Sequence, residues 1–195
     1  MNKIELRVMA ISRSVTQSSN YAVVLGERQG PRRLPVIIGS QEAQAIAIAI
    51  EGLESSRPMT HDLFKNTLET LRTEVREVII NDLREGVFFA RLVLDNAGDI
   101  VEVDSRTSDA IALAVRFDCP IYTYGHILDS AGITLEGDDE DEMGEAVEEA
   151  AARDTDNLTR YNVGELNTML EEVLGQENYE RAAEIRDELN RRKGN

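Results

Sequence analysis

Three short segments of the chain place a hydroxyl side chain two positions before a carboxylate, each where a helix is expected to begin. They are Ser40-Gln-Glu42, Thr60-His-Asp62 and Thr107-Ser-Asp109. One interpretation is structural: the hydroxyl caps free backbone N–H groups, and the acid offsets the positive end of the helix dipole by about 0.3–1 kcal/mol. The other is chemical, because a helix start keeps a carboxylate ionised near neutral pH.

Ionised carboxylates suit metal binding better than general acid catalysis. A divalent ion held by several of them can activate water and stabilise the transition state of phosphoryl transfer. Mg²⁺ and Mn²⁺ prefer oxygen ligands of this kind. If the fold brings the acids together, the predicted ligands are Glu42, Asp62, Asp104 and Asp109.

Two dense polar clusters, residues 57–62 and 104–109, offer further catalytic groups. Arg57 or Arg106 could neutralise phosphate oxygens, because a guanidinium matches phosphate geometry. His61 could move a proton near neutral pH. The predicted catalytic residues are therefore His61, Asp62, Arg57 and Arg106, provided that the two clusters meet in the fold. The chain has no Gly-rich phosphate loop, nucleophile elbow or zinc-type Cys/His spacing.

An Ala-rich helical sequence occurs twice, and each copy follows an apolar strand. Residues 42–50 (EAQAIAIAI) resemble residues 109–115 (DAIALAV), about 67 positions further on. The preceding strands are expected at residues 34–38 and 100–103. A helix so rich in Ala and Ile packs closely on a sheet, so this near-repeat predicts a pseudo-symmetric arrangement with chemistry gathered at the two helix starts.

Residues 1–128 fit an α+β domain with a mixed, largely antiparallel sheet. Thr60 is expected to cap a helix over residues 61–74, and Thr107 the second Ala-rich helix. Apolar alternation and turn signals predict the strands. The expected strands are residues 3–15, 21–25, 33–38, 77–83, 87–94, 99–103 and 120–124.

The acidity of the chain is concentrated after this domain. Of the net charge of −16, residues 1–128 carry little, with 14 basic and 17 acidic side chains, whereas residues 129–163 carry 2 basic and 12 acidic ones. Residues 129–162 are therefore predicted to be a solvated acidic linker. The near-neutral domain lacks the basic footprint usual in nucleic-acid binders.

The cysteine content and the apolar runs predict a cytoplasmic protein that does not cross a membrane. Cys119 is the single cysteine, so it forms no internal disulfide, which is compatible with a reducing compartment. No apolar run is long enough to span a bilayer, and the amino terminus lacks a signal pattern.

Residues 163–193 are predicted to form a helical hairpin. An apolar stripe runs from Leu166 to Leu174, Gly175 ends the first helix and Asn178 caps the second. Two helices of this length bury too little area to be stable alone. The hairpin is therefore expected to dock on a second copy, on the main domain or on another protein.

Several of these motifs occur in order and resemble the bifunctional nuclease domain family. They are residues 33–39 (RLPVIIG), Glu42-Ala, residues 57–63 (RPMTHDL) and residues 103–114 (VDSRTSDAIALA), so the resemblance covers most of residues 1–128. It implies a compact α+β domain that self-associates and, as plant members are named, cleavage of both RNA and DNA. It defines no catalytic residues, so the site residues given above rest on the polar clusters.

The carboxyl end resembles a UVR motif. Residues 165–170 (ELNTML) are followed by residues 178–189 (NYERAAEIRDEL), which contain the pattern Tyr-Glu-x-Ala-Ala-x-x-Arg-Asp. Such hairpins mediate protein–protein contact in nucleotide excision repair subunits and in some protease adaptors. The resemblance implies a protein partner or homotypic pairing through residues 163–193.

Two functions from different classes follow. The first is a metal-assisted nuclease acting on RNA or DNA, with the hairpin used for recruitment. The second is a non-catalytic regulatory or adaptor module that the hairpin docks on a repair or proteolysis complex. The polar clusters and the family resemblance favour the first, whereas the near-neutral domain favours the second.

Overall fold

The computed structural model describes residues 2–13, 20–53, 55–134, 144, 158, 161–175 and 178–193. The chain divides into two compact units, Met1–Ala152 and Arg153–Asn195. Most of the predicted acidic linker, residues 129–162, lies outside the described residues, so its solvated character stays a prediction. Each unit is considered by itself below.

The first unit is built on an eight-stranded sheet with the order β6-β5-β4-β7-β1-β2-β3-β8. Only the β4–β7 pair among the described strands is parallel, so the sheet is mixed and largely antiparallel, as predicted. The strands are β1 (Lys3–Arg13), β2 (Asn20–Glu27), β3 (Arg32–Gly39), β4 (Thr73–Arg84), β5 (Val87–Asn96), β6 (Asp99–Arg106), β7 (Ile121–Tyr124) and β8 (Ile133–Thr134).

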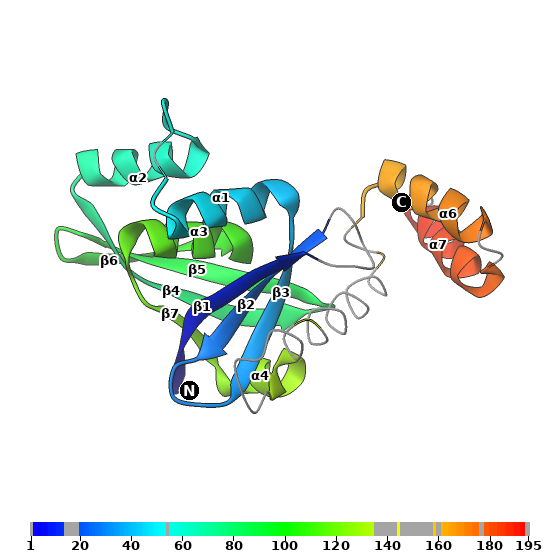
Figure 1. Cartoon of the computed structure of the whole chain (residues 1–195), viewed down its shortest axis with the longest axis horizontal. Coiled ribbons are helices and arrows are strands. Elements are labelled where there is room, and N and C mark those ends of the chain that lie inside the picture. The colour runs from blue at the N-terminus through cyan, green and yellow to red at the C-terminus, as the bar shows by residue number, and fades with distance from the viewer. Residues whose placement is uncertain are drawn as a thin grey trace. The chain divides into compact units, whose positions relative to one another are not determined.

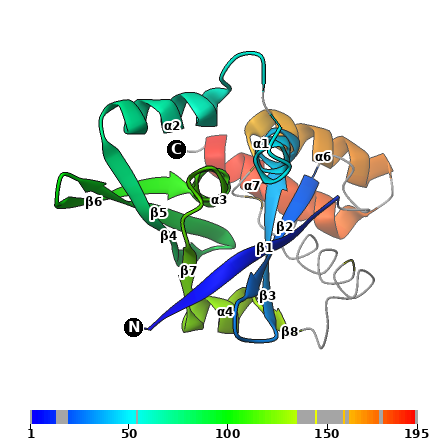
Figure 2. The ribbon, with the colours of Figure 1, turned by 60° about the vertical axis from the view of Figure 1, so that its left-hand side comes forward.

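Three helices of 11 residues each lie together on one side of this sheet (Figure 1). They are α1 (Ser40–Ile50), α2 (Thr60–Thr70) and α3 (Thr107–Phe117). α3 contacts both of the others and lies between them, as Figure 2 shows. α1 begins directly after β3, and α3 begins directly after β6. The two Ala-rich copies are thus equivalent strand–helix units that pack against each other, as the near-repeat predicted.

The core between helices and sheet is aliphatic. Ile46 of α1 and Ile111 of α3 are fully buried, together with strand residues such as Val23, Ile80 and Leu92. The small Ala side chains of α1 and α3 allow the two helices to approach each other and the sheet closely. This packing fixes where the first turns of α1 and α3 lie.

Two details of the helix starts and ends differ from the prediction. α2 ends at Thr70 rather than at residue 74, because Arg72 adopts a left-handed conformation (φ 56°) and β4 begins at Thr73. Thr60 and Thr107 are the first helical residues of α2 and α3. The cap positions before them are Met59 and Arg106, and neither side chain carries a hydroxyl group. Hydroxyl capping was therefore the wrong interpretation of these two positions.

The folded domain extends beyond the predicted boundary at residue 128. α4 (Gly125–Ala131) contacts β3, β4 and β7, and β8 then pairs with β3. Both elements are too short to leave a periodic signal, which explains why the sequence did not predict them.

The second unit is a helical hairpin of α6 (Val163–Gly175) and α7 (Tyr179–Lys193). Asn162 and Glu165 cap α6 reciprocally, and the Asn178 side chain accepts the backbone N–H of Arg181 at 3.2 Å, as predicted for α7. The hairpin has its own small core around Leu166 and Ile185. Neither these helices nor any other in the described part of the chain combines the length and apolar character needed to cross a membrane.

Candidate functional site at three helix starts

The first turns of α1, α2 and α3 meet on one side of the domain. Each supplies an acid: Glu42 from α1, Asp62 from α2 and Asp109 from α3. Because the backbone N–H groups of a first turn are positively polarised, three such turns in one place favour bound anions or carboxylates. The structure thus places acids from three predicted helix starts on one side of the domain, and their role in chemistry stays a prediction.

Four of the predicted site residues form one hydrogen-bonded network. His61 Nε2 lies 3.0 Å from Asp109 Oδ1. Arg106 donates from Nε to Asp109 Oδ2 at 2.8 Å and from Nη2 to Asp109 Oδ1 at 3.2 Å, a bidentate pair. Its Nη1 donates to Glu42 Oε1 at 3.0 Å. Arg106 thus joins the starts of α1 and α3, and His61 joins α2 to them.

The chemistry of this network is set by the ionised state of Asp109. Burial is the largest influence and raises the pKa of the Asp109 carboxyl group, but the hydrogen bonds from Arg106 and His61 together bring that pKa below its ordinary value. An ionised carboxylate only accepts hydrogen bonds, so His61 must carry its proton on Nε2. In the neutral ring this leaves Nδ1 as a base on a side chain that is 16% exposed.

Asp62 points away from this network, although it follows His61 directly. Its Oδ2 accepts the backbone N–H of Met59 at 2.9 Å and so caps α2. Its Oδ1 accepts Arg116 Nε at 2.8 Å. The Arg116 hydrogen bond, followed by that from Met59, holds the pKa of Asp62 below its usual value. Asp62 therefore caps α2 and pairs with Arg116, and it is not part of the network around Asp109.

Arg116 is a component of the site that the sequence analysis missed. Its side chain is 5% exposed, and besides Asp62 it donates from Nη1 to the backbone oxygens of Ala45 and Ala112, both at 3.0 Å. One guanidinium thus bonds α1, α2 and α3. A signal was present: Arg116 lies seven residues after Asp109, on the same face of an otherwise apolar helix.

Two predicted residues lie outside the network. Arg57 is exposed in the segment before α2 and makes no hydrogen bond or ion pair within the described residues. Asp104 is exposed on β6, directly opposite Arg91 of β5. Neither of them contacts His61 or Asp109.

The four predicted metal ligands do not converge. Among the described residues no three His, Cys, Asp or Glu side chains are grouped so that they could hold a metal ion. Glu42 and Asp109 share Arg106, whereas Asp62 is paired with Arg116 and Asp104 lies on β6. Two arginines therefore take the place that a cation would have in the predicted four-carboxylate site.

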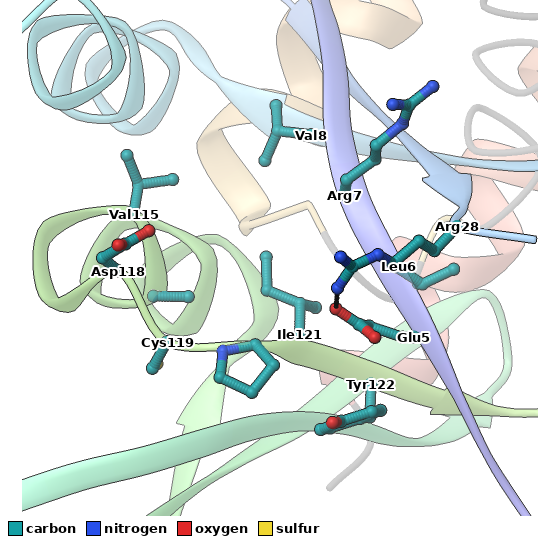
Figure 3. A pocket seen from close by; sticks show the side chains of 12 residues that line it. Glu5, Leu6, Arg7, Val8, Arg28, Val115, Asp118, Cys119, Ile121 and Tyr122 are labelled. Carbon is teal, nitrogen blue, oxygen red and sulfur yellow. Dashed lines mark hydrogen bonds and ion pairs between the residues drawn. The ribbon is translucent and has the colours of Figure 1, made fainter.

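A hollow of about 610 Å³ lies at the other end of α3, between its last turn and strands β1 and β7. Figure 3 shows apolar side chains such as Val8 and Ile121 on its walls and the Arg28–Glu5 ion pair at its edge. Cys119 also lines it, and burial raises the pKa of this thiol to about 11, so the thiol is unreactive at neutral pH. None of the predicted site residues lines this hollow.

The comparison with known proteins finds a family model that matches most of the first unit. Residues 23–136 match the model of the bifunctional nuclease domain, which covers more than half of the chain. The chain belongs to the bifunctional nuclease domain family. The matched segment contains α1, α2, α3 and β6, and with them every residue of the network.

Relatives include both an uncharacterized bacterial protein and plant nucleases. An uncharacterized protein of Mycobacterium tuberculosis is 40% identical over 146 residues, which are 74% of this chain and 86% of that protein. Bifunctional nuclease 1 of Arabidopsis thaliana is 28% identical over 183 residues, or 86% of this chain and 55% of that protein. Bifunctional nuclease 2 of Oryza sativa is 32% identical over 116 residues, or 57% of this chain and 36% of that protein.

Proposed function

We propose that this protein is a nuclease that hydrolyses phosphodiester bonds of RNA and DNA at the meeting point of the three helix starts. Membership of the bifunctional nuclease domain family and the names of the plant relatives support the reaction class. The observation that carries the proposal at the level of residues is the 3.0 Å contact between His61 Nε2 and Asp109 Oδ1. It joins a potential general base to a carboxylate that orients it.

In the proposed reaction His61 acts as the general base. Asp109 holds the Nε2–H side of the ring, so Nδ1 takes a proton from a water molecule as the water oxygen attacks phosphorus. The bond from phosphorus to the leaving sugar oxygen breaks, and that oxygen takes a proton from solvent. Because water is the nucleophile, the 2′-hydroxyl of RNA is not needed and DNA is an equally acceptable substrate.

Arg106 and Arg57 are proposed to bind the phosphate. Arg106 is 68% exposed and uses three N–H groups on Asp109 and Glu42, so further donors of its five remain for phosphate oxygens. Arg57 lies exposed just before α2. The three helix starts add positive polarisation at the same place.

A divalent ion, Mg²⁺ or Mn²⁺, remains part of the proposal only as an assisting ligand. Among the predicted ligands, Glu42 and Asp109 share one partner, Arg106, so an ion held by these two carboxylates would have to displace that guanidinium. A bound ion would supply further charge stabilisation to the phosphate. The roles proposed for His61 and Arg57 do not depend on it.

A second candidate function is a non-catalytic regulatory or adaptor module. The observation in its favour is that Arg106 and Arg116 pair with Glu42, Asp62 and Asp109, so the network can also serve structure alone. In this proposal residues 163–193 bind a protein partner in a repair or proteolysis complex, as the UVR resemblance predicts. Self-association of the domain likewise stays a prediction.

A cleavage assay separates the two proposals. Purified wild-type protein is incubated with labelled single-stranded RNA and DNA, with EDTA or with added Mg²⁺ or Mn²⁺. Asp109→Asn is compared with Asp104→Asn, a matched change on the same β6–α3 segment that lies outside the network. We expect wild-type cleavage, retention in Asp104→Asn and loss in Asp109→Asn, with both variants folded at the assay temperature as judged by circular dichroism.

The other results of that assay are equally informative. Activity in EDTA would remove the metal from the proposal but leave His61 and Asp109 in place. Equal activity of the two Asp→Asn variants would remove Asp109 from the mechanism. No cleavage by the wild type under any of these conditions would favour the adaptor.

A further inference from the structure

α2 is attached to the domain mainly through polar contacts. Of its 11 residues only Leu68 is buried. Three polar links join it to α3: His61 to Asp109, Asp62 to Arg116, and Lys65 Nζ to the backbone oxygen of Arg116 at 2.8 Å. A helix with so little apolar burial depends on such links for its position.

Two of these three links end on Arg116. Asp62 binds its guanidinium, and Lys65 binds its backbone oxygen. Its guanidinium also bonds the backbone of α1 through Ala45 and of α3 through Ala112. The planar fork of an arginine fixes the directions of all its donors at once, so the three helices are held at set positions relative to one another. Burial of the side chain strengthens these hydrogen bonds because little water competes for them.

We propose that Arg116 is the positioning residue of the candidate site: by holding Asp62, it sets the distance between His61 on α2 and Asp109 on α3. It does not touch the substrate in this proposal and acts only through His61. The proposal rests on the proposed nuclease function for its kinetic consequence, but its structural consequence can be measured without any activity.

The kinetic consequence is a loss of turnover without a loss of binding. A misplacement of about 1 Å can reduce turnover about 10²-fold. We therefore expect Arg116→Lys, which keeps the charge but loses the fork, to lower kcat about 10²-fold with little change in KM. Asp62→Asn is the milder second variant, because its amide oxygen can still cap α2 while the charge paired with Arg116 is lost.

The structural consequence is read at His61 by nitrogen NMR. The chain has two histidines, and His126 on α4 is an internal reference, since it stacks on Tyr124 and contacts none of the three helix starts. The Nε2 chemical shift of His61 reports its hydrogen bond to Asp109. We expect this shift to move in Arg116→Lys and in Asp62→Asn, while the His126 signals stay in place.

A matched control is Arg91→Lys. Arg91 pairs with Glu102 across β5 and β6 and touches none of the three helices. A His61 shift that stays unchanged in Arg116→Lys, or that moves equally in Arg91→Lys, would overturn the positioning role. If the wild type shows no cleavage, the nuclease proposal fails, and the His61 shift alone decides whether Arg116 positions the ring.

Discussion

α2 and α3 have the same length and both contribute to the candidate site, but they are held in place by different forces. α3 buries seven of its residues, whereas α2 buries one. α3 lies between the other two helices and against the sheet, and apolar packing fixes it. α2 depends on hydrogen bonds and ion pairs to α3.

This difference in how the two helices are held applies to the two members of the proposed catalytic pair, His61 and Asp109. Asp109 sits on the helix that the core holds rigidly, and His61 sits on the helix held by polar links. Mutations in the core should therefore act on stability, whereas mutations in the polar links should act on the geometry of His61.

The largest effect on stability is expected at the centre of α3. Ile111 is fully buried among strand and helix side chains. Ile111→Ala should lower the free energy of unfolding by about 2–5 kcal/mol, because it removes buried apolar surface and leaves a cavity. Denaturant titration followed by circular dichroism measures this, and a loss below about 1 kcal/mol would show that α3 is not the packed helix described.

A smaller effect is expected at the one buried residue of α2. Leu68 is 8% exposed and packs at the edge of the same core. Leu68→Ala should cost about 2 kcal/mol, the low end for such a change, because the edge of the core can relax into the space. The same titration applies, and a cost equal to that of Ile111→Ala would erase the contrast between the helices.

The smallest effect is expected from the acid titration of the polar links. The pKa values of Asp62 and Asp109 are lowered in the folded protein from an unfolded value near 3.8. Their stabilising contribution is therefore complete above pH 3.8 and is lost as the pH falls below it through the folded pKa values. Wild type should be more stable than Asp62→Asn at pH 6, and the difference should shrink as the pH falls below 3.8. A stability difference that stays constant across this range, in unfolding curves recorded at each pH, would remove the charge of Asp62 as its cause.

The sequence predicted the elements whose signal is periodic and local. The repeated Ala-rich segments at Glu42 and Asp109 were placed correctly because their apolar spacing and the strand that precedes each of them are both visible in the chain. The end of α2 was not, since the left-handed conformation of Arg72 leaves no pattern.

The site was predicted in part for a similar physical reason. His61, Arg106, Glu42 and Asp109 were identified as polar residues at helix starts, and the fold joins them. Asp62 faces elsewhere because consecutive residues on a helix point in different directions. The sequence places Arg116 on the same helix face as Asp109, but its partners Asp62 and Ala45 lie on other helices, so only the fold shows what it holds.

In the proposed reaction His61, oriented by Asp109, is the base of a phosphodiester hydrolysis. The most direct test is the value of kcat/KM on single-stranded RNA and DNA for His61→Gln and for His126→Gln, the matched change at the other histidine. We expect a loss of about 10²–10⁴-fold for His61→Gln, with His126→Gln close to wild type and both variants folded at the assay temperature. Wild-type kcat/KM in His61→Gln would contradict it.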